Sequence, residues 1–169
     1  MISVSEKVLC EKDISTVLHC GICLVTVSDG IKDNGCIINS AVQITDEPPR
    51  IVFSLGKRSY THKLLMKTGE FNLSVLDRRV GMDFIGKFGN TNGRENPKFK
   101  DESGFARSEN GILYPTGCAN TVMSFENVAL TDWDTHTCFT AKLKSIMRLS
   151  DIEGVSYADY LDMKEKEEN

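Results

Sequence analysis

The segment from Asn34 to His62 constrains the fold of this chain more than any other part of the sequence. It reads in order as a strand with polar edges, a sharp turn at Pro48 and Pro49, an apolar strand from Arg50 to Leu55, and a helix that opens at Ser59. A short apolar run bounded by turn residues indicates a strand, and a hydroxyl residue before a periodic segment indicates a helix start. The sequence therefore predicts a strand–turn–strand–helix unit.

The loop between this second strand and the helix is a candidate phosphate site. Gly56-Lys57-Arg58-Ser59 leads into a helix N-terminus, where unpaired backbone N–H groups and the positive end of the helix dipole favour an anion. A hydroxyl at the expected N-cap and two flanking cations strengthen this interpretation. The alternative is an ordinary capped helix with solvated basic residues. From the loop alone, that alternative is the more economical interpretation.

Length and composition indicate an ordinary globular protein. A chain of 169 residues predicts one domain over residues 1–169, large enough to bury a core without disulfides or metal ions. A net charge of −4 argues against nucleic acid as a partner. No apolar run approaches membrane-spanning length, and the first residues, MISVSEKVLCEKD, lack the apolar core of a secretory signal. We expect a cytoplasmic protein.

The cysteines are expected to be reduced thiols rather than a disulfide framework or a metal site. They are Cys10, Cys20, Cys23, Cys36, Cys118 and Cys138. Cys20 and Cys23 form a C-x-x-C pair, but no second pair stands at a zinc-finger spacing. Cys23 also enters an apolar strand, whereas a thioredoxin-like pair opens a helix. Core packing is the favoured interpretation, with a mononuclear iron or zinc site as the alternative.

The remaining pattern predicts short strands with helices inserted between them. Helices are expected at residues 5–16, 60–68, 79–88 and 157–169, and strands at residues 21–27, 36–45, 50–55, 71–76, 121–130 and 137–147. Residues 89–111 are polar and glycine-rich, and a loop of this length is usually functional or mobile. This order favours an α+β antiparallel barrel over a doubly wound sheet, and no Gly-x-Gly-x-x-Gly follows a strand.

The order of motifs resembles the flavin reductase-like family of FMN-binding split-barrel proteins. NG-x4-NS from Asn34 is followed by a double proline, an apolar strand, and K-x-S-x-T-H from Lys57 to His62. The resemblance continues in GEFNLSVL, FIGKFG, GR-x3-KF and D-x-HT, and it covers roughly residues 21–160. It implies an α+β antiparallel split β-barrel with inserted helices, of the flavoredoxin or NAD(P)H:FMN oxidoreductase type.

The same resemblance implies a set of cofactor-binding residues. They are Asn39, Ser40, Gln43, Thr45, Lys57, Ser59, Thr61, His62, Lys87, Phe88 and His136. Lys57, Ser59 and Thr61 would serve the phosphate, whereas Asn39 and Ser40 would face the polar edge of the flavin.

Two positions depart from the family pattern, and three of the implied ligands have plain alternatives. Gln43 replaces a small hydroxyl residue, and Gly56 stands where Asn or Asp is common. Lys87 could be a solvated lysine, and His136 could bond a core carbonyl. His62 would have to be neutral to donate to a phosphate oxygen at a helix N-terminus.

The implied function is an FMN-dependent reductase that passes electrons from NAD(P)H to a flavin, a rubredoxin-type carrier, ferric iron or oxygen. Hydride transfer requires no protein acid, so no catalytic side chain and no metal ligand is expected. Relatives of this kind are usually homodimers, and we expect one here. Two alternatives stay open: an FMN-binding electron carrier, flavoredoxin-like, that another redox protein reduces, and a degenerate binder that has lost the cofactor. NADH and NADPH are both compatible with the sequence.

Overall fold

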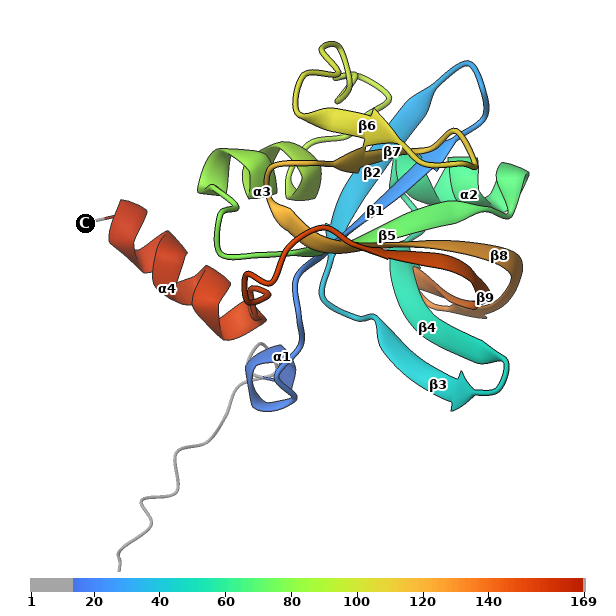
Figure 1. Ribbon diagram of the computed structural model, residues 1–169, viewed down its shortest axis with the longest axis horizontal. Helices are drawn as coiled ribbons and strands as arrows, with labels where there is room; N and C mark the ends of the chain where they lie inside the picture. Colours follow the sequence, from blue (N-terminus) through green and yellow to red (C-terminus); the bar gives the residue numbers. More distant parts are fainter. Residues whose placement is uncertain (1–13, 169) are drawn as a thin grey trace, which may run out of the picture.

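The computed structural model describes residues 14–168, which form a strongly curved antiparallel sheet with helices on its outside (Figure 1). The seven-stranded sheet has the order β2-β1-β5-β8-β9-β4-β3. Its strands are β1 (Cys23–Ser28), β2 (Asp33–Ile38), β3 (Val42–Asp46), β4 (Pro49–Gly56), β5 (Phe71–Leu76), β8 (Ala119–Trp133) and β9 (His136–Arg148). A separate two-stranded sheet pairs β6 (Phe105–Arg107) with β7 (Leu113–Pro115). The helices are α1 (Ile14–Val17), α2 (Tyr60–Thr68), α3 (Met82–Gly89) and α4 (Tyr157–Glu167).

One hydrophobic core lies inside the curved sheet and is closed by α2. Phe53, Phe71, Phe125 and Phe139 are fully buried there, and Phe71 stacks on Phe125 with ring centroids 5.1 Å apart. Offset aromatic pairs of this kind stabilise a core beyond the area that they bury. The apolar side of α2 packs into the same cluster, so this core fixes the position of the helix that follows β4.

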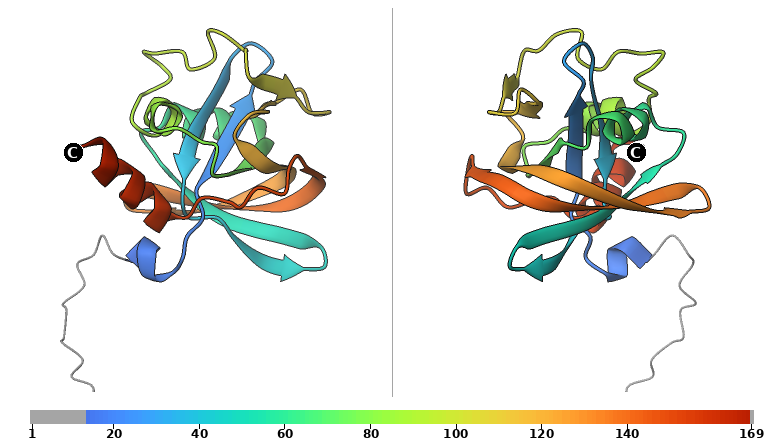
Figure 2. Two further views of the ribbon diagram at one scale, coloured as in Figure 1. Left: turned by 60° about the vertical axis from the view of Figure 1, so that its left-hand side comes forward. Right: turned by 90° about the vertical axis from the view of Figure 1, so that its right-hand side faces the viewer.

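A second core lies on the other side of β1, under α3 and α4. Cys23, Val25 and Val27 of β1 face the first core, whereas Leu24 packs with Phe88 of α3 in the second. Because alternate side chains of a strand point to opposite faces, both faces of β1 are covered. This explains its continuous apolar sequence, which predicts a buried strand. The left view of Figure 2 shows α3 and α4 on the same side of the β1–β2 hairpin.

The unit predicted from the opening segment is confirmed at α2. Ser59 is the N-cap, and its hydroxyl oxygen accepts a hydrogen bond from the backbone N–H of His62 at 3.0 Å. Gly69 ends the helix in the left-handed conformation, with φ 69°, and its N–H donates to Leu65 O. A residue without Cβ adopts that conformation at little cost.

Other predicted boundaries are corrected. The single strand expected at residues 36–45 is two strands, because the chain bends between β2 and β3, where the Ser40 hydroxyl binds the Ser54 backbone. Helix α3 begins at Met82 rather than at residue 79, since Arg79 is held in a turn by Asp77. The expected loop at 89–111 contains β6. The helix predicted at residues 5–16 falls mostly outside the described residues, and α4 confirms the helix predicted near the C-terminus.

Candidate functional site

A hollow of about 250 Å³ opens at the N-terminus of α2, and we call it the α2-end hollow. Three segments build it: the start of α2, strand β2, and the chain that leaves α3. Its lining residues are Asn34, Cys36, Arg58, Ser59, Tyr60, Thr61, Phe88, Gly89, Asn90, Thr91, Asn92, Gly93 and Lys98. Of the residues implied by the family resemblance, the structure brings Ser59, Thr61 and Phe88 together here.

The first turn of α2 supplies the donors that an anion needs. The N–H groups of the first helical turn have no acceptor within the helix, and Ser59 satisfies that of His62. In that bond the Ser59 oxygen is the acceptor, so its own proton is available to another partner. Ser59 is therefore both the N-cap and part of the wall of the hollow. An ordinary capped helix and a phosphate site, the two interpretations of this loop, are therefore compatible.

The inner wall of the α2-end hollow is polar and buried. Asn34 is 1% exposed, and its Nδ2 donates to the Thr61 hydroxyl at 2.9 Å. The Oδ1 atom of Asn34 has no hydrogen-bond partner among residues 14–168. Lys98 is 3% exposed, and its Nζ donates to Gly35 O at 2.8 Å and to Phe88 O at 2.9 Å. Burial lowers the pKa of Lys98.

Sequence reasoning missed Asn34 and Lys98 as site residues. Both stand in motifs that carry the family resemblance, NG-x4-NS and GR-x3-KF. Membership in these motifs was the only signal that could have marked the two residues as part of a site. Asparagine and lysine are usually exposed, and their burial here arises only in the folded chain. A buried lysine is rare enough that no composition argument predicts it.

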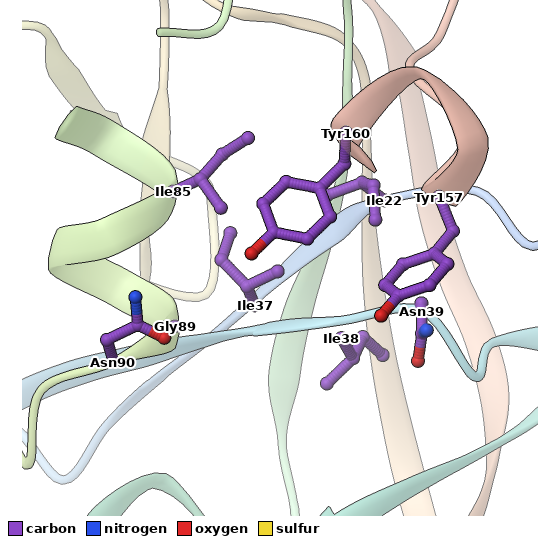
Figure 3. Close-up of a pocket in the computed structure, with 9 residues that line it drawn as sticks. All are labelled: Ile22, Ile37, Ile38, Asn39, Ile85, Gly89, Asn90, Tyr157 and Tyr160. Carbon is purple, nitrogen blue, oxygen red and sulfur yellow. The ribbon is translucent and has the colours of Figure 1, made fainter. Parts of the chain in front are cut away.

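A second hollow of about 230 Å³ adjoins the first, and the two share Gly89 and Asn90 at the end of α3. Figure 3 shows Tyr157 and Tyr160 of α4 facing Asn39 and the isoleucines of β2 across this space. Isoleucine and tyrosine side chains with a few amide groups are the usual lining for a flat organic ring. We call it the α3–α4 hollow. Asn39, implied by the resemblance, lies in its wall.

Three residues implied on the segment after β2 are occupied elsewhere. The Ser40 hydroxyl accepts from the Ser54 N–H at 3.0 Å. Gln43 Nε2 donates to Thr45 O and to Asp46, and the Thr45 hydroxyl donates to Pro48 O. Gln43 and Thr45 are exposed on the β3–β4 hairpin, and the structure does not bring them to either hollow.

His62, Lys57 and His136 gather at the start of β9 and line neither hollow. His62 Nε2 lies 2.8 Å from the Thr137 hydroxyl, which donates to Asp132, and Lys57 Nζ lies 3.4 Å from Asp132. Burial lowers the pKa of His62 more than the Asp132 charge raises it, so the ring is neutral near pH 7.

The structure also places two further residues of the implied cofactor-binding set, His136 and Lys87, and Cys23 of the C-x-x-C pair. His136 is exposed and pairs with Gly56 across the β4–β9 ladder. Lys87 is exposed on α3, with its Nζ 5.5 Å from the Phe88 ring centroid. Cys23 packs in the first core, as predicted, and burial raises the pKa of its thiol to about 12.

Within the described part of the chain, no group of three His, Cys, Asp or Glu side chains could hold a metal ion. The helices between residues 14 and 168 are all too short or too polar to cross a membrane.

Comparison with known proteins decides the family. Residues 16–160 match the family model described as a flavin reductase like domain. The chain belongs to the flavin reductase-like family. A ferric-chelate reductase (NAD(P)H) from Archaeoglobus fulgidus is 33% identical over 144 residues, which cover 85% of this chain and 85% of the relative. The high molecular weight rubredoxin of Moorella thermoacetica is 32% identical over 147 residues, which cover 85% of this chain and 62% of that relative.

Solved structures agree on the architecture. An FMN-binding protein from Thermus thermophilus with bound 1-cyclohex-2-enone superposes with a TM-score of 0.72, at 19% identity, over 88% of this chain and 80% of that one. At this identity the similarity establishes the fold alone. It confirms the predicted α+β split barrel. For this member of the flavin reductase-like family, the family and its curated relatives indicate an oxidoreductase that works with a flavin.

Proposed function

We propose that this protein is an FMN-dependent oxidoreductase that passes electrons from NAD(P)H to an external acceptor. The observation that carries the proposal is the α2-end hollow, where a capped helix N-terminus meets the buried polar groups of Asn34 and Lys98. Helix N-termini with unpaired N–H groups bind phosphates. An unpartnered buried carbonyl such as Asn34 Oδ1 is costly unless a ligand completes it.

FMN fits this arrangement with its phosphate at the α2 N-terminus and its ring toward the α3–α4 hollow. Ser59 and the first-turn amides of α2 would hold the phosphate, with Arg58 in the wall of the same hollow. Asn39, Tyr157 and the apolar wall would bind the ring and exclude water from one side. When bound, the flavin supplies the two-electron chemistry that no side chain of the chain provides.

The remaining residues implied by the resemblance have weaker support. Lys57, His62 and His136 lie near one another but line neither hollow, and Gln43 and Thr45 face solvent. We retain them as candidate contacts for the nicotinamide nucleotide or for a partner chain, since a second subunit can complete a site. Ser40 and Lys87 remain candidates for the flavin edge. Phe88, although buried in the second core, contributes to the wall of the α2-end hollow.

The names of two relatives support NAD(P)H as the electron donor and two of the proposed acceptors. The Archaeoglobus relative is named for ferric chelate and NAD(P)H, and the Moorella relative is named a rubredoxin. We therefore propose ferric iron or a rubredoxin-type carrier as the acceptor, and we keep a flavin and oxygen, which the family resemblance implies, as further candidates. The second candidate function is a flavoredoxin-like electron carrier reduced by another redox protein. The Moorella relative favours it, because a rubredoxin exchanges electrons with proteins.

We further propose that the chain acts as one domain in the cytoplasm and forms a homodimer. Support for the dimer comes from an apolar hollow of about 320 Å³ whose lining comes from β1, β3, β4, β5, β8 and β9 and includes Val42, Ile51, Val75 and Ile146. Val42 is 58% exposed and Ile146 is 62% exposed. Exposed apolar side chains gathered around a hollow are typical of a protein–protein contact.

The test is to record the visible spectrum of the purified protein and then add NADH or NADPH without oxygen. We expect a flavin spectrum, about one noncovalent FMN per chain released by acid, and bleaching by one of the two nucleotides. A flavin spectrum that neither nucleotide bleaches would contradict the reductase and favour the second candidate function, the electron carrier. A protein that neither carries nor takes up flavin would overturn the proposal, and release of FAD as the main flavin would correct the cofactor.

A further inference from the structure

A third hollow, of about 320 Å³, adjoins the α2-end hollow, and the proposed flavin position leaves it unused. We call it the Tyr60–Arg94 hollow, after two of the residues that line it. It shares Tyr60 and Gly93 with the α2-end hollow. The two hollows are therefore neighbours at the first turn of α2.

Gly93 determines how closely the two hollows approach. Any Cβ at this position would overlap the Asn34 side chain, so the absence of a side chain lets the segment after α3 pack against β2. Arg94 follows at once and lines the Tyr60–Arg94 hollow. Its guanidinium carbon lies 5.9 Å from the centroid of the Tyr60 ring. An aromatic face and a guanidinium therefore stand together beside the candidate phosphate site.

Packing fixes the aromatic wall of the Tyr60–Arg94 hollow. Phe99 lines the hollow and is half-buried. Its ring centroid lies 5.2 Å from that of Phe88 and 5.0 Å from that of Phe105. Tyr60 is also half-buried and packs against the first core. Rings held in this way present a preformed surface to another planar ring.

The charges around the Tyr60–Arg94 hollow favour an anion. Lys32 and Arg94 line it together with Asp33 and Glu102. Arg107 binds both carboxylates, because its Nη2 lies 2.8 Å from Asp33 Oδ2 and 2.6 Å from Glu102 Oε1. The charged lining residues and Arg107 together carry a net positive charge, which attracts a negatively charged ligand.

Planar side chains next to cations are the chemistry that recognises a nucleotide. Bases stack on aromatic rings, and a guanidinium binds phosphate oxygens through a fork of N–H donors. The plain alternative is a cation–π pair on a solvated loop. That alternative accounts for Arg94 over Tyr60, but it gives no role to a preformed hollow that adjoins the candidate phosphate site.

We propose that the Tyr60–Arg94 hollow binds the adenosine 5′-phosphate group of a dinucleotide, with the base on Tyr60 and Phe99 and the phosphate at Arg94. The inference rests on the proposed function for the dinucleotide, because FAD and NAD(P)H both carry this group to a flavin oxidoreductase. In FAD the flavin phosphate is linked directly to the adenosine phosphate, which matches two neighbouring hollows. When FMN is the cofactor, the hollow is free for the adenosine phosphate of NAD(P)H.

The test compares ligands that differ only in this group. In the flavin arm, the dissociation constants of FAD and FMN are measured from flavin fluorescence with the apo protein. In the donor arm, kcat/KM is measured for NADH, NADPH and reduced nicotinamide mononucleotide, which lacks the group, with the FMN-loaded protein.

Three variants and a matched control are measured in both arms. Tyr60→Leu should lower the preference for the adenosine-bearing ligand about 5- to 100-fold, as for loss of one stacked base. Arg94→Met should lower it at least about tenfold, as for loss of a hydrogen bond to a charged group. Tyr60→Phe keeps the ring and should stay within about threefold of wild type. So should Lys100→Met, since Lys100 is exposed on the same segment and lies outside the linings of the three hollows.

The arm in which the preference falls identifies the source of the group. A fall in the flavin arm assigns the hollow to FAD, and a fall in the donor arm assigns it to the nicotinamide nucleotide. Equal losses for both ligands of each comparison would show a structural role for Tyr60 and Arg94 and overturn the inference. Preferences that no variant changes in either arm would overturn it as well.

A third measurement separates this inference from the proposed function. Binding of 5′-AMP and of ribose 5-phosphate, which lacks the base, is measured by calorimetry without flavin. If wild type takes up no flavin but prefers 5′-AMP, and Tyr60→Leu loses that preference, the proposed function fails and the inference stands. If wild type binds FMN and a nicotinamide nucleotide reduces it, while no preference depends on Tyr60 or Arg94, the proposed function stands and the inference is wrong.

Discussion

At the scale of single residues, Ser59 shows why one side chain can satisfy both a structural and a binding interpretation. Its oxygen caps α2 by accepting from the His62 N–H, and the same residue lines the α2-end hollow. The cap was predictable, because a hydroxyl before a periodic apolar segment is a local signal. The hollow was not, because its other walls come from distant parts of the chain.

Replacing Ser59 by Asp tests the phosphate position. Aspartate is as good an N-cap as serine, so the Tm of the apo protein should hold or rise. Its carboxylate would stand against a phosphate, and at an effective dielectric of ~20 the repulsion should weaken FMN binding by at least about a hundredfold. Titration of FMN into the apo protein measures this.

The matched control is Ser59→Asn, which caps the helix with the same shape and no charge. It should bind FMN within roughly tenfold of wild type, since at most one hydrogen bond is lost. Riboflavin affinity should be similar in both variants. If Ser59→Asp binds FMN as tightly as Ser59→Asn, the phosphate lies elsewhere.

At the scale of elements, the predictable parts are those whose signals are local. Helix α2 matched its predicted range because Ser59 and Gly69 mark both ends. The start of α3 and the break after β2 were missed because they depend on contacts made only in the folded chain, such as the Ser40–Ser54 bond. The Asn34–Gly93 contact and the burial of Lys98 are of the same kind.

The turn before α3 gives a pH-dependent prediction. Burial would raise the pKa of Asp77, but hydrogen bonds from Arg79 Nε at 3.0 Å and Nη2 at 2.6 Å outweigh it and hold the pKa below its ordinary value. A carboxyl with a depressed folded pKa stabilises the protein above its unfolded pKa of about 3.9, and that contribution is lost as the pH falls through the folded pKa.

We therefore expect Asp77→Asn to lower the Tm by about 4–8 °C at pH 7. The Tm difference between Asp77→Asn and wild type should shrink progressively below about pH 4, because the Asp77 carboxyl of the wild type becomes protonated. Thermal unfolding followed by circular dichroism across pH 2–7 measures it. Asp162→Asn, an exposed site on α4, should follow wild type throughout. A Tm difference that is independent of pH would assign the loss to shape rather than charge.

At the scale of the whole molecule, the sequence predicted the fold but not the position of the apolar patch on the surface. The order of strands and helices and the family motifs indicated a split barrel, which the fold confirms. The apolar surface around Val42 and Ile146 was not visible as a pattern, because its residues come from β1, β3, β4, β5, β8 and β9 and become neighbours only in the curved sheet.

That surface carries the last prediction, a symmetric dimer that buries it. In a twofold interface each residue of the patch meets the same patch on the partner, so a single charge is introduced twice and is costly to desolvate. We expect wild type to be a dimer by light scattering at micromolar concentration, and Ile146→Lys to be a monomer. Ile31→Lys, an 87% exposed site at the turn between β1 and β2, is the control and should stay dimeric. A wild-type protein that is monomeric and still binds flavin would contradict the predicted dimer. Loss of flavin binding only in the Ile146→Lys monomer would indicate that the partner subunit completes the flavin site.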